Sequence, residues 1–248
     1  MRSPLQRRRH RGYVGLLITC LGVMTCLMLP HGLRQLAAIG YLALPLVLLF
    51  TLGLPIHEGR WPRLRTHAYR LLAFITWVSS LVWYLTPLSQ QGTGVPLLAL
   101  WAVLVLWSCE RLIGNLAMER RINRQVLLGA LAGYLLLGLA AGLLFCGLET
   151  VAPGSFAAGR SLDGPVLRWQ GATADRSSPV WAVDFVELNY FAFVTLTTTG
   201  YGDIHPVTPQ TQMLCVIVAI TGTVYLAMVM GLLISRYTAR DVEDDLDN

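Results

Sequence analysis

The sequence predicts an all-α integral membrane protein with six membrane-spanning helices and one shorter helical segment that enters the bilayer and returns. Three observations predict this class. Of the 248 residues, 54% are apolar and only 13% are charged, which is about half the charged share of soluble domains. The charged residues are segregated, so long stretches contain none. Finally, the uncharged stretch 188–202 is too short to cross a bilayer and return as helix.

Five charge-free stretches are each long enough for at least one spanning helix, which needs roughly 20 apolar residues. The longest, 71–109, is divided by the polar segment 86–96, whose Gly and Pro residues are typical of a tight loop. This stretch therefore holds two spans. The six spans are predicted at 13–30, 33–54, 68–87, 95–114, 126–148 and 210–236.

The basic residues predict the orientation of these spans. All 19 are Arg, and most lie in short segments at 2–11, 60–70 and 111–124. Basic short loops remain in the cytoplasm, so both termini are expected there, in a multi-pass protein of the cell membrane. The net charge of +5 then reflects topology, and we expect no nucleic-acid partner. The first span is expected to be retained rather than cleaved as a signal peptide.

The five Cys and five His residues do not indicate a reactive site. The Cys residues fall within predicted spans without CxxC spacing, as small buried apolar side chains do. No His belongs to an HExxH pattern or has a suitable second ligand on one helical face. We therefore expect no enzyme activity, no cofactor and no identifiable soluble ligand.

A loop between the fifth and sixth spans carries the most information. It follows a long polar segment at 149–183. Asp184 and Glu187 have the spacing of a capping box, which predicts a short helix that starts at residue 185 and runs inward from the outer face. The Thr run and Gly-Tyr-Gly that follow would return to the outside as extended chain. Irregular backbone at membrane depth is tolerated only inside protein or along a water-filled path, so this loop predicts a conduction or binding site.

The run Thr-Leu-Thr-Thr-Thr-Gly-Tyr-Gly-Asp at 195–203 resembles the selectivity filter of potassium channels, and the similarity extends over roughly 126–238. The resemblance implies a potassium channel subunit. Because one such loop cannot surround an ion, four copies must assemble as a four-fold symmetric homotetramer. Residues 1–125 would then form a four-span membrane domain with a cytoplasmic N-terminal segment, and 126–248 the pore domain. The all-Arg, Ala- and Leu-rich composition suggests a bacterial source.

In such filters, backbone carbonyl oxygens replace the water around the ion. The resemblance implies that potassium binds the carbonyls of Thr198, Thr199, Gly200 and Tyr201, with the Thr198 hydroxyl as the innermost ring. Gly200 and Gly202 can adopt φ values that other residues resist, which makes this ladder possible. The supporting positions are Thr195, Thr197, Asp203, Tyr190 and Val194, and the pore-helix cap is Asp184 with Glu187.

Three positions depart from the family's commonest pattern. Thr199 stands where the family most often has Val, and it adds a hydroxyl behind the filter. Val194 stands where some bacterial members have Glu, so a carboxyl contact with Asp203 is impossible. Tyr190 stands where the family often has Trp. We predict that the Tyr190 hydroxyl bonds Asp203; interfacial packing of Tyr190 is the alternative.

The sixth span should line the cavity inside the filter. Thr208 and Pro209 predict its start, as a cap and a first helical residue. Gly222 stands 20 residues after Gly202, where many bacterial members carry a hinge glycine. The sequence leaves two roles for Gly222 open, a gating hinge and close packing against a neighbouring helix.

The first four spans occupy the position of a voltage sensor but lack its regularly spaced arginines. The only basic residue of the fourth span is Arg111, at the cytoplasmic end beside Glu110, so steep voltage gating is not expected. The predicted function is passive, potassium-selective conduction. The alternatives are a less selective monovalent cation channel, or a transporter or membrane enzyme that uses 184–203 as a substrate loop. The latter would need intramembrane carboxylates or His, which the spans lack apart from their ends.

Overall fold

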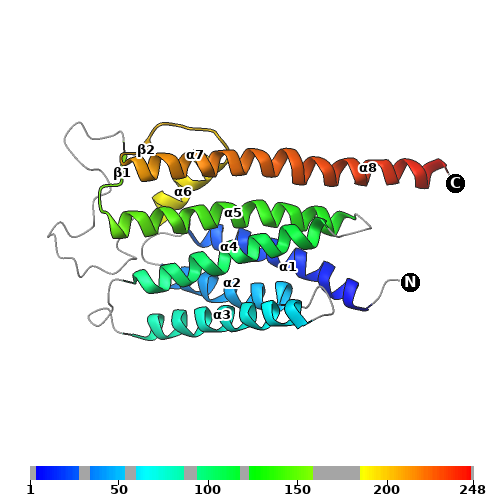
Figure 1. Ribbon diagram of the computed structural model, residues 1–248, viewed down its shortest axis with the longest axis horizontal. Helices are drawn as coiled ribbons and strands as arrows, with labels where there is room; N and C mark the ends of the chain where they lie inside the picture. The colour runs from blue at the N-terminus through cyan, green and yellow to red at the C-terminus, as the bar shows by residue number, and fades with distance from the viewer. Residues whose placement is uncertain are drawn as a thin grey trace. The chain divides into compact units, whose positions relative to one another are not determined.

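The computed structural model describes residues 4–27, 34–53, 60–86, 94–117, 123–158 and 185–246, and these are mostly helical (Figure 1). The elements are α1 (Pro4–Leu27), α2 (Arg34–Leu52), α3 (Arg60–Leu85), α4 (Val95–Ala117), α5 (Arg124–Val151), β1 (Phe156–Ala158), α6 (Phe185–Leu196), β2 (Ile204–Pro206), α7 (Pro209–Val224), the π-helix η4 (Tyr225–Met230) and α8 (Gly231–Leu246).

Every predicted span coincides with a helix, but the described helices differ in length. Among the described residues, four helices are long and apolar enough to cross a membrane: Leu64–Leu85, Val95–Leu116, Arg124–Val151 and Pro209–Thr238. Within the residues searched for spans, α1 and α2 contribute the shorter apolar segments Gly12–Leu27 and Leu42–Leu52, and both helices begin before these segments, at Pro4 and Arg34. The ends of the predicted spans 13–30 and 33–54 fall outside the described residues. The chain is therefore a multi-pass membrane protein by its helices, and the total of six spans remains a prediction.

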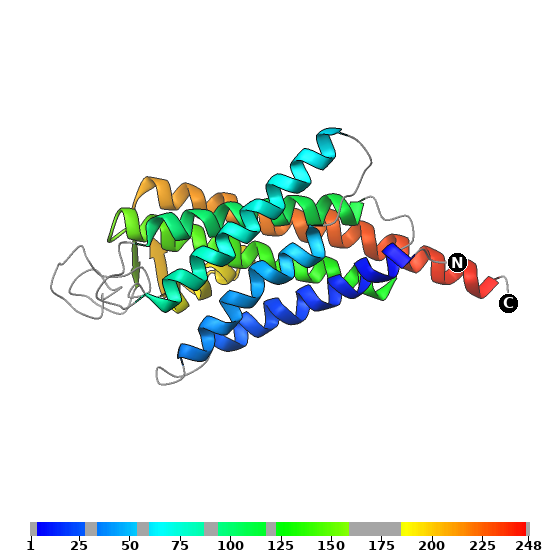
Figure 2. The same cartoon turned by 90° about the horizontal axis from the view of Figure 1, so that it is seen from below.

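The chain divides into two compact units, and α3, α4 and α5 contribute residues to both. The first unit contains Met1–Val78, Leu106–Leu136 and Val224–Asn248. In it, α1 packs against α2 (Figure 2). Gly12 permits close approach, since a Cβ there would lie 3.2 Å from Cγ2 of Thr51. The sequence instead predicted a single boundary at residue 125, between a four-span domain and a pore domain, and that division stays a prediction.

A buried polar cluster joins three helices of the first unit. The Tyr69 hydroxyl of α3 donates to the carbonyl of Leu48 in α2 at 3.3 Å and shares a 2.8 Å hydrogen bond with Ser108 of α4. Arg111 of α4 is also buried, with its guanidinium carbon 4.6 Å from the centre of the Tyr69 ring. Near it, Arg65 and Glu110 form an exposed ion pair at 2.8 Å. These contacts explain the polar residues of α3 and α4 as helix-packing groups.

The second unit contains Ser79–Val105 and Leu137–Thr223. Its centre is an aromatic cluster of Phe145, Phe156 and Phe191, with ring centroids between 5.1 and 5.7 Å apart. Phe156 starts β1, which pairs antiparallel with β2 so that Ala157 faces His205. This short ribbon fixes the chain that follows α5 to the chain that enters α7.

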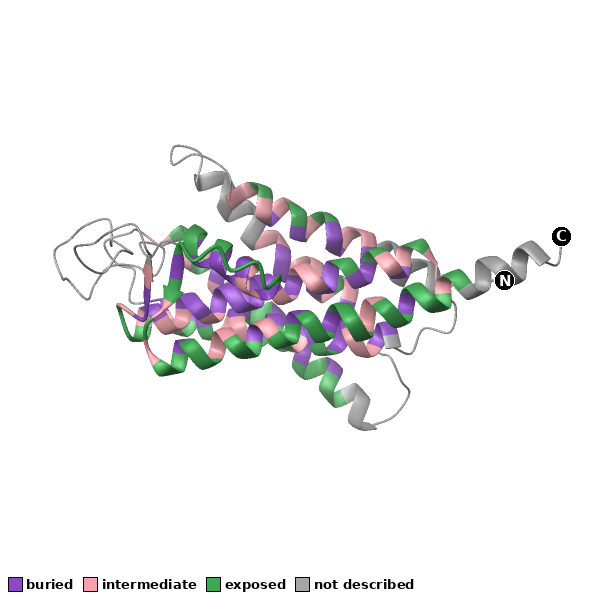
Figure 3. Cartoon of the chain, turned by 90° about the horizontal axis from the view of Figure 1, so that it is seen from above, coloured by how far each residue is buried: buried purple, intermediate pink, exposed green. Residues whose placement is uncertain are grey.

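The last helix begins as predicted and then departs from regular α-geometry. The Thr208 hydroxyl accepts a hydrogen bond from the Thr211 amide at 3.3 Å, and Pro209 is the first helical residue. The helix continues to Leu246, past the predicted end at 236, and a π-helix interrupts it over η4. Exposed residues dominate its surface (Figure 3). Only 17% of its most apolar window is buried, against 67% for α5.

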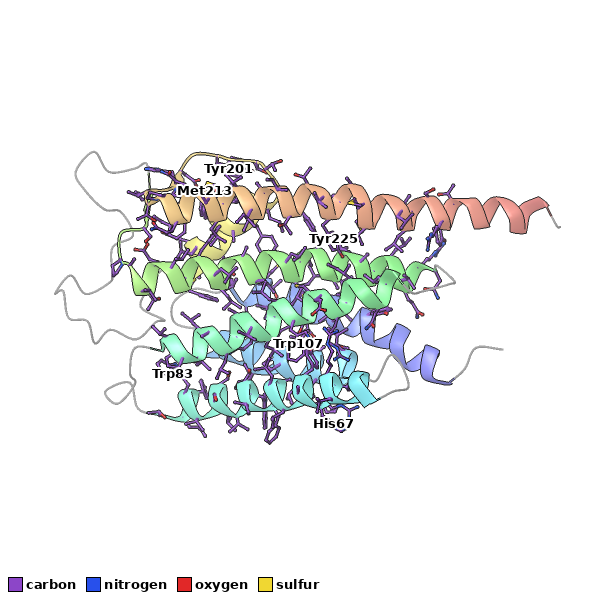
Figure 4. The ribbon with its side chains drawn as sticks, viewed as in Figure 1. His67, Trp83, Trp107, Tyr201, Met213 and Tyr225 are labelled. Carbon is purple, nitrogen blue, oxygen red and sulfur yellow. The ribbon has the colours of Figure 1, made fainter. Side chains whose placement is uncertain are left out.

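The π-helix was not predicted, and a tyrosine anchors its first residue. The hydroxyl of Tyr225, which is labelled in Figure 4, donates to the Ala130 carbonyl of α5 at 2.6 Å. Gly133 leaves the necessary space, because a Cβ there would collide with the Tyr225 hydroxyl. The Tyr134 ring lies 5.8 Å from the Tyr225 ring. A π-turn adds one residue to a helical turn, and here the extra residue coincides with the point at which Tyr225 is held.

Candidate functional site

The candidate site begins with α6, a 12-residue helix over Phe185–Leu196. Its start is the predicted one. Asp184 lies outside the described residues, whereas Glu187 is exposed in the first turn. The helix packs closely against α5 because α5 offers glycines: a Cβ at Gly138 would collide with the Phe193 ring, and a Cβ at Gly142 with the Asn189 side chain. The small residues of α5 therefore position α6.

The C-terminus of α6 forms a Schellman motif. The Thr199 amide donates to the Val194 carbonyl at 3.0 Å, and the Thr198 amide donates to the Thr195 carbonyl at 3.0 Å. In this motif the residue after the helix takes a left-handed conformation and is usually Gly. Here that residue is Thr198, with φ of 56°. A β-branched residue in this region is an outlier, and such strain costs about 1–3 kcal/mol and concentrates at functional sites.

The sign of φ alternates along the backbone that follows. Positive φ values occur at Thr198 (56°), Gly200 (58°) and Gly202 (77°), whereas Thr199 and Tyr201 have negative φ. In an ordinary strand successive carbonyls point to opposite sides, but left-handed residues at alternate positions let successive peptide groups turn the same way. The predicted use of Gly200 and Gly202 thus has a geometric basis, and Thr198 shares it.

One peptide of this segment can be oriented directly. The N–H and C=O of a trans peptide point in opposite directions. Because the Thr199 N–H points at the Val194 carbonyl of α6, the Thr198 carbonyl points away from α6. The side of the segment remote from α6 therefore receives this carbonyl oxygen, as a row of ion-binding oxygens would require.

Two threonine hydroxyls, those of Thr197 and Thr199, bond towards α6. The Thr197 hydroxyl donates to the Phe193 carbonyl at 2.8 Å and shares a 2.8 Å hydrogen bond with the Thr199 hydroxyl. The Thr198 hydroxyl donates to the Thr197 carbonyl at 2.7 Å. Val194 is buried and contributes no polar side-chain atom. The added hydroxyl of Thr199 thus has a defined partner.

The other end of the segment is held by an aromatic residue and a carboxylate. The Tyr190 hydroxyl donates to Oδ2 of Asp203 at 2.7 Å, so the predicted hydrogen bond is present. Oδ1 of Asp203 accepts the Ile204 amide at 3.0 Å. The Tyr201 ring, marked in Figure 4, stacks parallel to the Tyr190 ring, with centroids 6.4 Å apart. The Tyr201 ring is therefore connected to α6 through its stacking against Tyr190.

Glu149 supports the same end of the loop and was not singled out from the sequence. It is buried in the last turn of α5, and its two oxygens accept the amides of Gly154 at 2.7 Å and Phe156 at 3.1 Å. These bonds hold the turn that leads into β1 and thereby the β1–β2 ribbon next to Asp203. An acid followed by Pro and Gly at the end of an apolar helix was the available signal.

Of the two roles left open for Gly222, the structure favours packing. Gly222 is buried, and a Cβ at this position would collide with the carbonyl of Leu196, the last residue of α6. The irregular part of this helix lies further on, at η4. Gly222 therefore brings α7 against the residue from which the threonine segment starts.

Comparison with known proteins identifies the same part of the chain. Residues 164–239 match the family model described as ion channel. A segment of 52 residues is 41% identical to two-pore potassium channel 4 of Arabidopsis thaliana. This segment makes up 21% of the chain and 18% of that protein, so the chain covers under a fifth of this relative. The family match and the apolar helices support an ion-channel domain in a multi-pass membrane protein.

Proposed function

We propose that this chain is one subunit of a homotetrameric potassium-selective channel that conducts the ion passively across the cell membrane. In this proposal α6 is the pore helix, Thr198, Thr199, Gly200, Tyr201 and Gly202 form the selectivity filter, and α5 and α7 are the outer and inner helices. The observation that carries the proposal is the alternating sign of φ over residues 198–202, because it allows successive carbonyl oxygens to face one side.

The chemistry of potassium binding fits this backbone. A potassium ion that sheds its water needs replacement oxygens, and a row of carbonyl dipoles supplies them. The Thr198 carbonyl already points away from α6, and the Thr198 hydroxyl can add the innermost ring. The C-terminal end of α6 carries a partial negative charge, which favours a cation on the inner side of the filter. No further cofactor is required.

The exposure of the segment supports an assembly of four. Thr198 to Asp203 are exposed in the single chain, and no atom lies within 4 Å of a Cβ built at Gly200 or Gly202. The α7 face carries exposed Met213, Ile217 and Ile220. One loop cannot enclose an ion, and a closed ring of identical loops can. We propose four subunits with cytoplasmic termini and six spans each.

The first four helices contribute little voltage sensing in this proposal. One elementary charge that crosses the whole membrane field gains about 2.3 kcal/mol per 100 mV. Arg111 is the only basic residue of α4, lies near its C-terminal end, and is buried against Tyr69. A single held charge gives at most a shallow dependence of conductance on voltage.

Flux into proteoliposomes tests the proposal. Purified protein is reconstituted with a potassium or a sodium gradient, and Gly200→Ala is compared with Gly147→Ala. Neither Cβ meets an atom within 4 Å, but only Gly200 has positive φ. Alanine costs about 1–2 kcal/mol in this left-handed region, in each of four subunits. We expect potassium flux well above sodium flux, lost in Gly200→Ala and retained in Gly147→Ala.

Each contrary result has a defined meaning. Equal sodium and potassium flux would indicate a less selective cation channel and overturn selectivity. Unchanged flux in Gly200→Ala would overturn the assignment of the filter. No flux of either ion would favour a transporter or enzyme that uses 184–203 as a substrate loop.

A further inference from the structure

The left-handed threonine at position 198 needs an explanation beyond the Schellman motif. Glycine usually fills this position because it has no Cβ, and a strained residue persists only where its surroundings over-determine it. The backbone bonds of Thr198 and Thr199 to α6 exist in any Schellman motif. The additional contacts in this chain are those of the two neighbouring threonine hydroxyls, at residues 197 and 199.

These hydroxyls form a directed relay. Each hydroxyl has one proton. The Thr197 hydroxyl donates its proton to the Phe193 carbonyl at 2.8 Å, so the 2.8 Å bond between the two hydroxyls is donated by Thr199. The hydroxyl relay therefore runs from Thr199 through Thr197 to Phe193 of α6. It connects the residues on both sides of Thr198.

We propose that Thr199 is a positioning residue that acts through this hydroxyl relay to hold Thr198 in its left-handed conformation and so to orient the carbonyls of Thr198 and Thr199. The inference rests on the proposed function of the segment as a selectivity filter. Thr199 is tied to α6 twice, by its amide to Val194 and by its hydroxyl through Thr197. A valine at 199 would match the shape of Thr199 and lose the second tie.

The relay replaces a support that Val194 cannot give. Val194 is buried three residues before Thr197 and has an apolar side chain. Among the described groups behind the segment, the side-chain hydrogen bonds come from Thr197, Thr199 and Thr198 itself. The third hydroxyl turns back onto the Thr197 carbonyl and does not reach α6. Removal of the Thr199 hydroxyl thus leaves the middle of the segment tied to α6 by the backbone bond from Thr199 to Val194 and takes away its side-chain tie.

A double-mutant cycle on the full-length tetramer tests the relay. The variants are Thr199→Val, Thr197→Val, the double variant and Thr199→Ser, and the readouts are the potassium-to-sodium flux ratio in proteoliposomes and the melting temperature. We expect Thr199→Val to lower the flux ratio about fivefold, the effect of one net hydrogen bond. Thr199→Ser keeps the donor and should restore the ratio. The double variant should lose no more than either single variant.

The outcomes separate the relay from the channel assignment. If the wild type conducts potassium and the losses of flux ratio in Thr199→Val and Thr197→Val add up in the double variant, the relay is overturned and the channel assignment stands. The same holds if Thr199→Ser has no higher flux ratio than Thr199→Val. A wild type without potassium flux overturns the proposed function and with it the positioning of a filter; the melting cycle then reports whether the two hydroxyls are still coupled. Non-additive loss of selectivity with rescue by serine supports both.

Discussion

Two tyrosines of this chain use their hydroxyls in opposite settings. Tyr69 has 0% of its surface exposed and bonds Leu48 and Ser108 beneath the guanidinium of Arg111. Tyr190 is 41% exposed and bonds Asp203 beside a segment that is itself exposed. The members of the first cluster, Tyr69, Ser108 and Arg111, are all buried within one chain. The second pair holds the backbone of residues 198–203, which is exposed to solvent in the single chain. Polar groups in α3 and α4 thus stabilise helix packing, whereas those around α6 hold an exposed backbone segment, which in the proposed channel would face further subunits and the ion.

The largest effect is expected at Gly222, where α7 packs closely against the last residue of α6. A Cβ in Gly222→Ala would press on the Leu196 carbonyl, so we expect about 1–3 kcal/mol of destabilisation per chain and loss of potassium flux. Thermal melting and flux measure the two effects. Gly114→Ala in α4 is the control, because nothing lies within 4 Å of its Cβ. A hinge role would instead predict altered open time at an unchanged melting temperature.

A pair of Tyr→Phe variants sharpens the same contrast. Tyr190→Phe removes the donor to Asp203, and we expect faster decay of potassium current with little change in melting temperature, because the bond is exposed. Tyr69→Phe removes a buried hydrogen bond and should destabilise by about 1 kcal/mol while the decay rate stays the same. Patch recordings and thermal melting provide both readouts.

Tyr84→Phe serves as the control for this pair, since Tyr84 is an exposed tyrosine on α3. Equal current decay in the wild type and Tyr190→Phe would mean that Tyr190 has only a packing role. Faster decay of potassium current in Tyr69→Phe would mean that the buried cluster around Tyr69 also influences the proposed filter.

The smallest expected effect on transport is that of Arg111→Gln. Its charge sits near the end of α4, against Tyr69, and moves through little of the field. We expect the slope of conductance against voltage to stay the same, with a loss of about 1 kcal/mol in stability from the cation–π contact. A shallower slope in the variant would show that the α3–α4 cluster senses voltage after all.

Much of the helical framework follows from where charge is absent. Charge-free stretches placed all six predicted spans on helices, and Thr208 with Pro209 marked the start of α7. The start of α6, the positive φ of Gly200 and Gly202 and the Tyr190–Asp203 bond also followed from residue types. Each of these features depends on local chemistry: solvation of charge, capping, glycine freedom, or one donor near one acceptor.

Other features depended on tertiary contacts that no local pattern encodes. Threonine resists the left-handed region, so Thr198 could be placed there only by the contacts of its segment with α6, which include the backbone bonds that end the helix. The π-helix η4 follows from the hydrogen bond of Tyr225 to Ala130, which lies 95 positions earlier, through the space left by Gly133. Glu149 accepts hydrogen bonds from the amides of Gly154 and Phe156, which come within reach only because the chain turns back after the end of α5.

The π-helix η4 also gives the last helix an adjustable count of residues per turn. A regular α-helix advances about 100° per residue, and a π-turn accommodates one additional residue. Conversion of η4 to α-geometry would therefore rotate every residue of α8 by about 100° about the helix axis while the bonds of the chain stay unchanged. Tyr225 would hold the stationary part. The number of residues per turn in η4 thus decides which side chains of α8 face a given direction. One residue inserted or deleted within 225–230 would change which side chains these are.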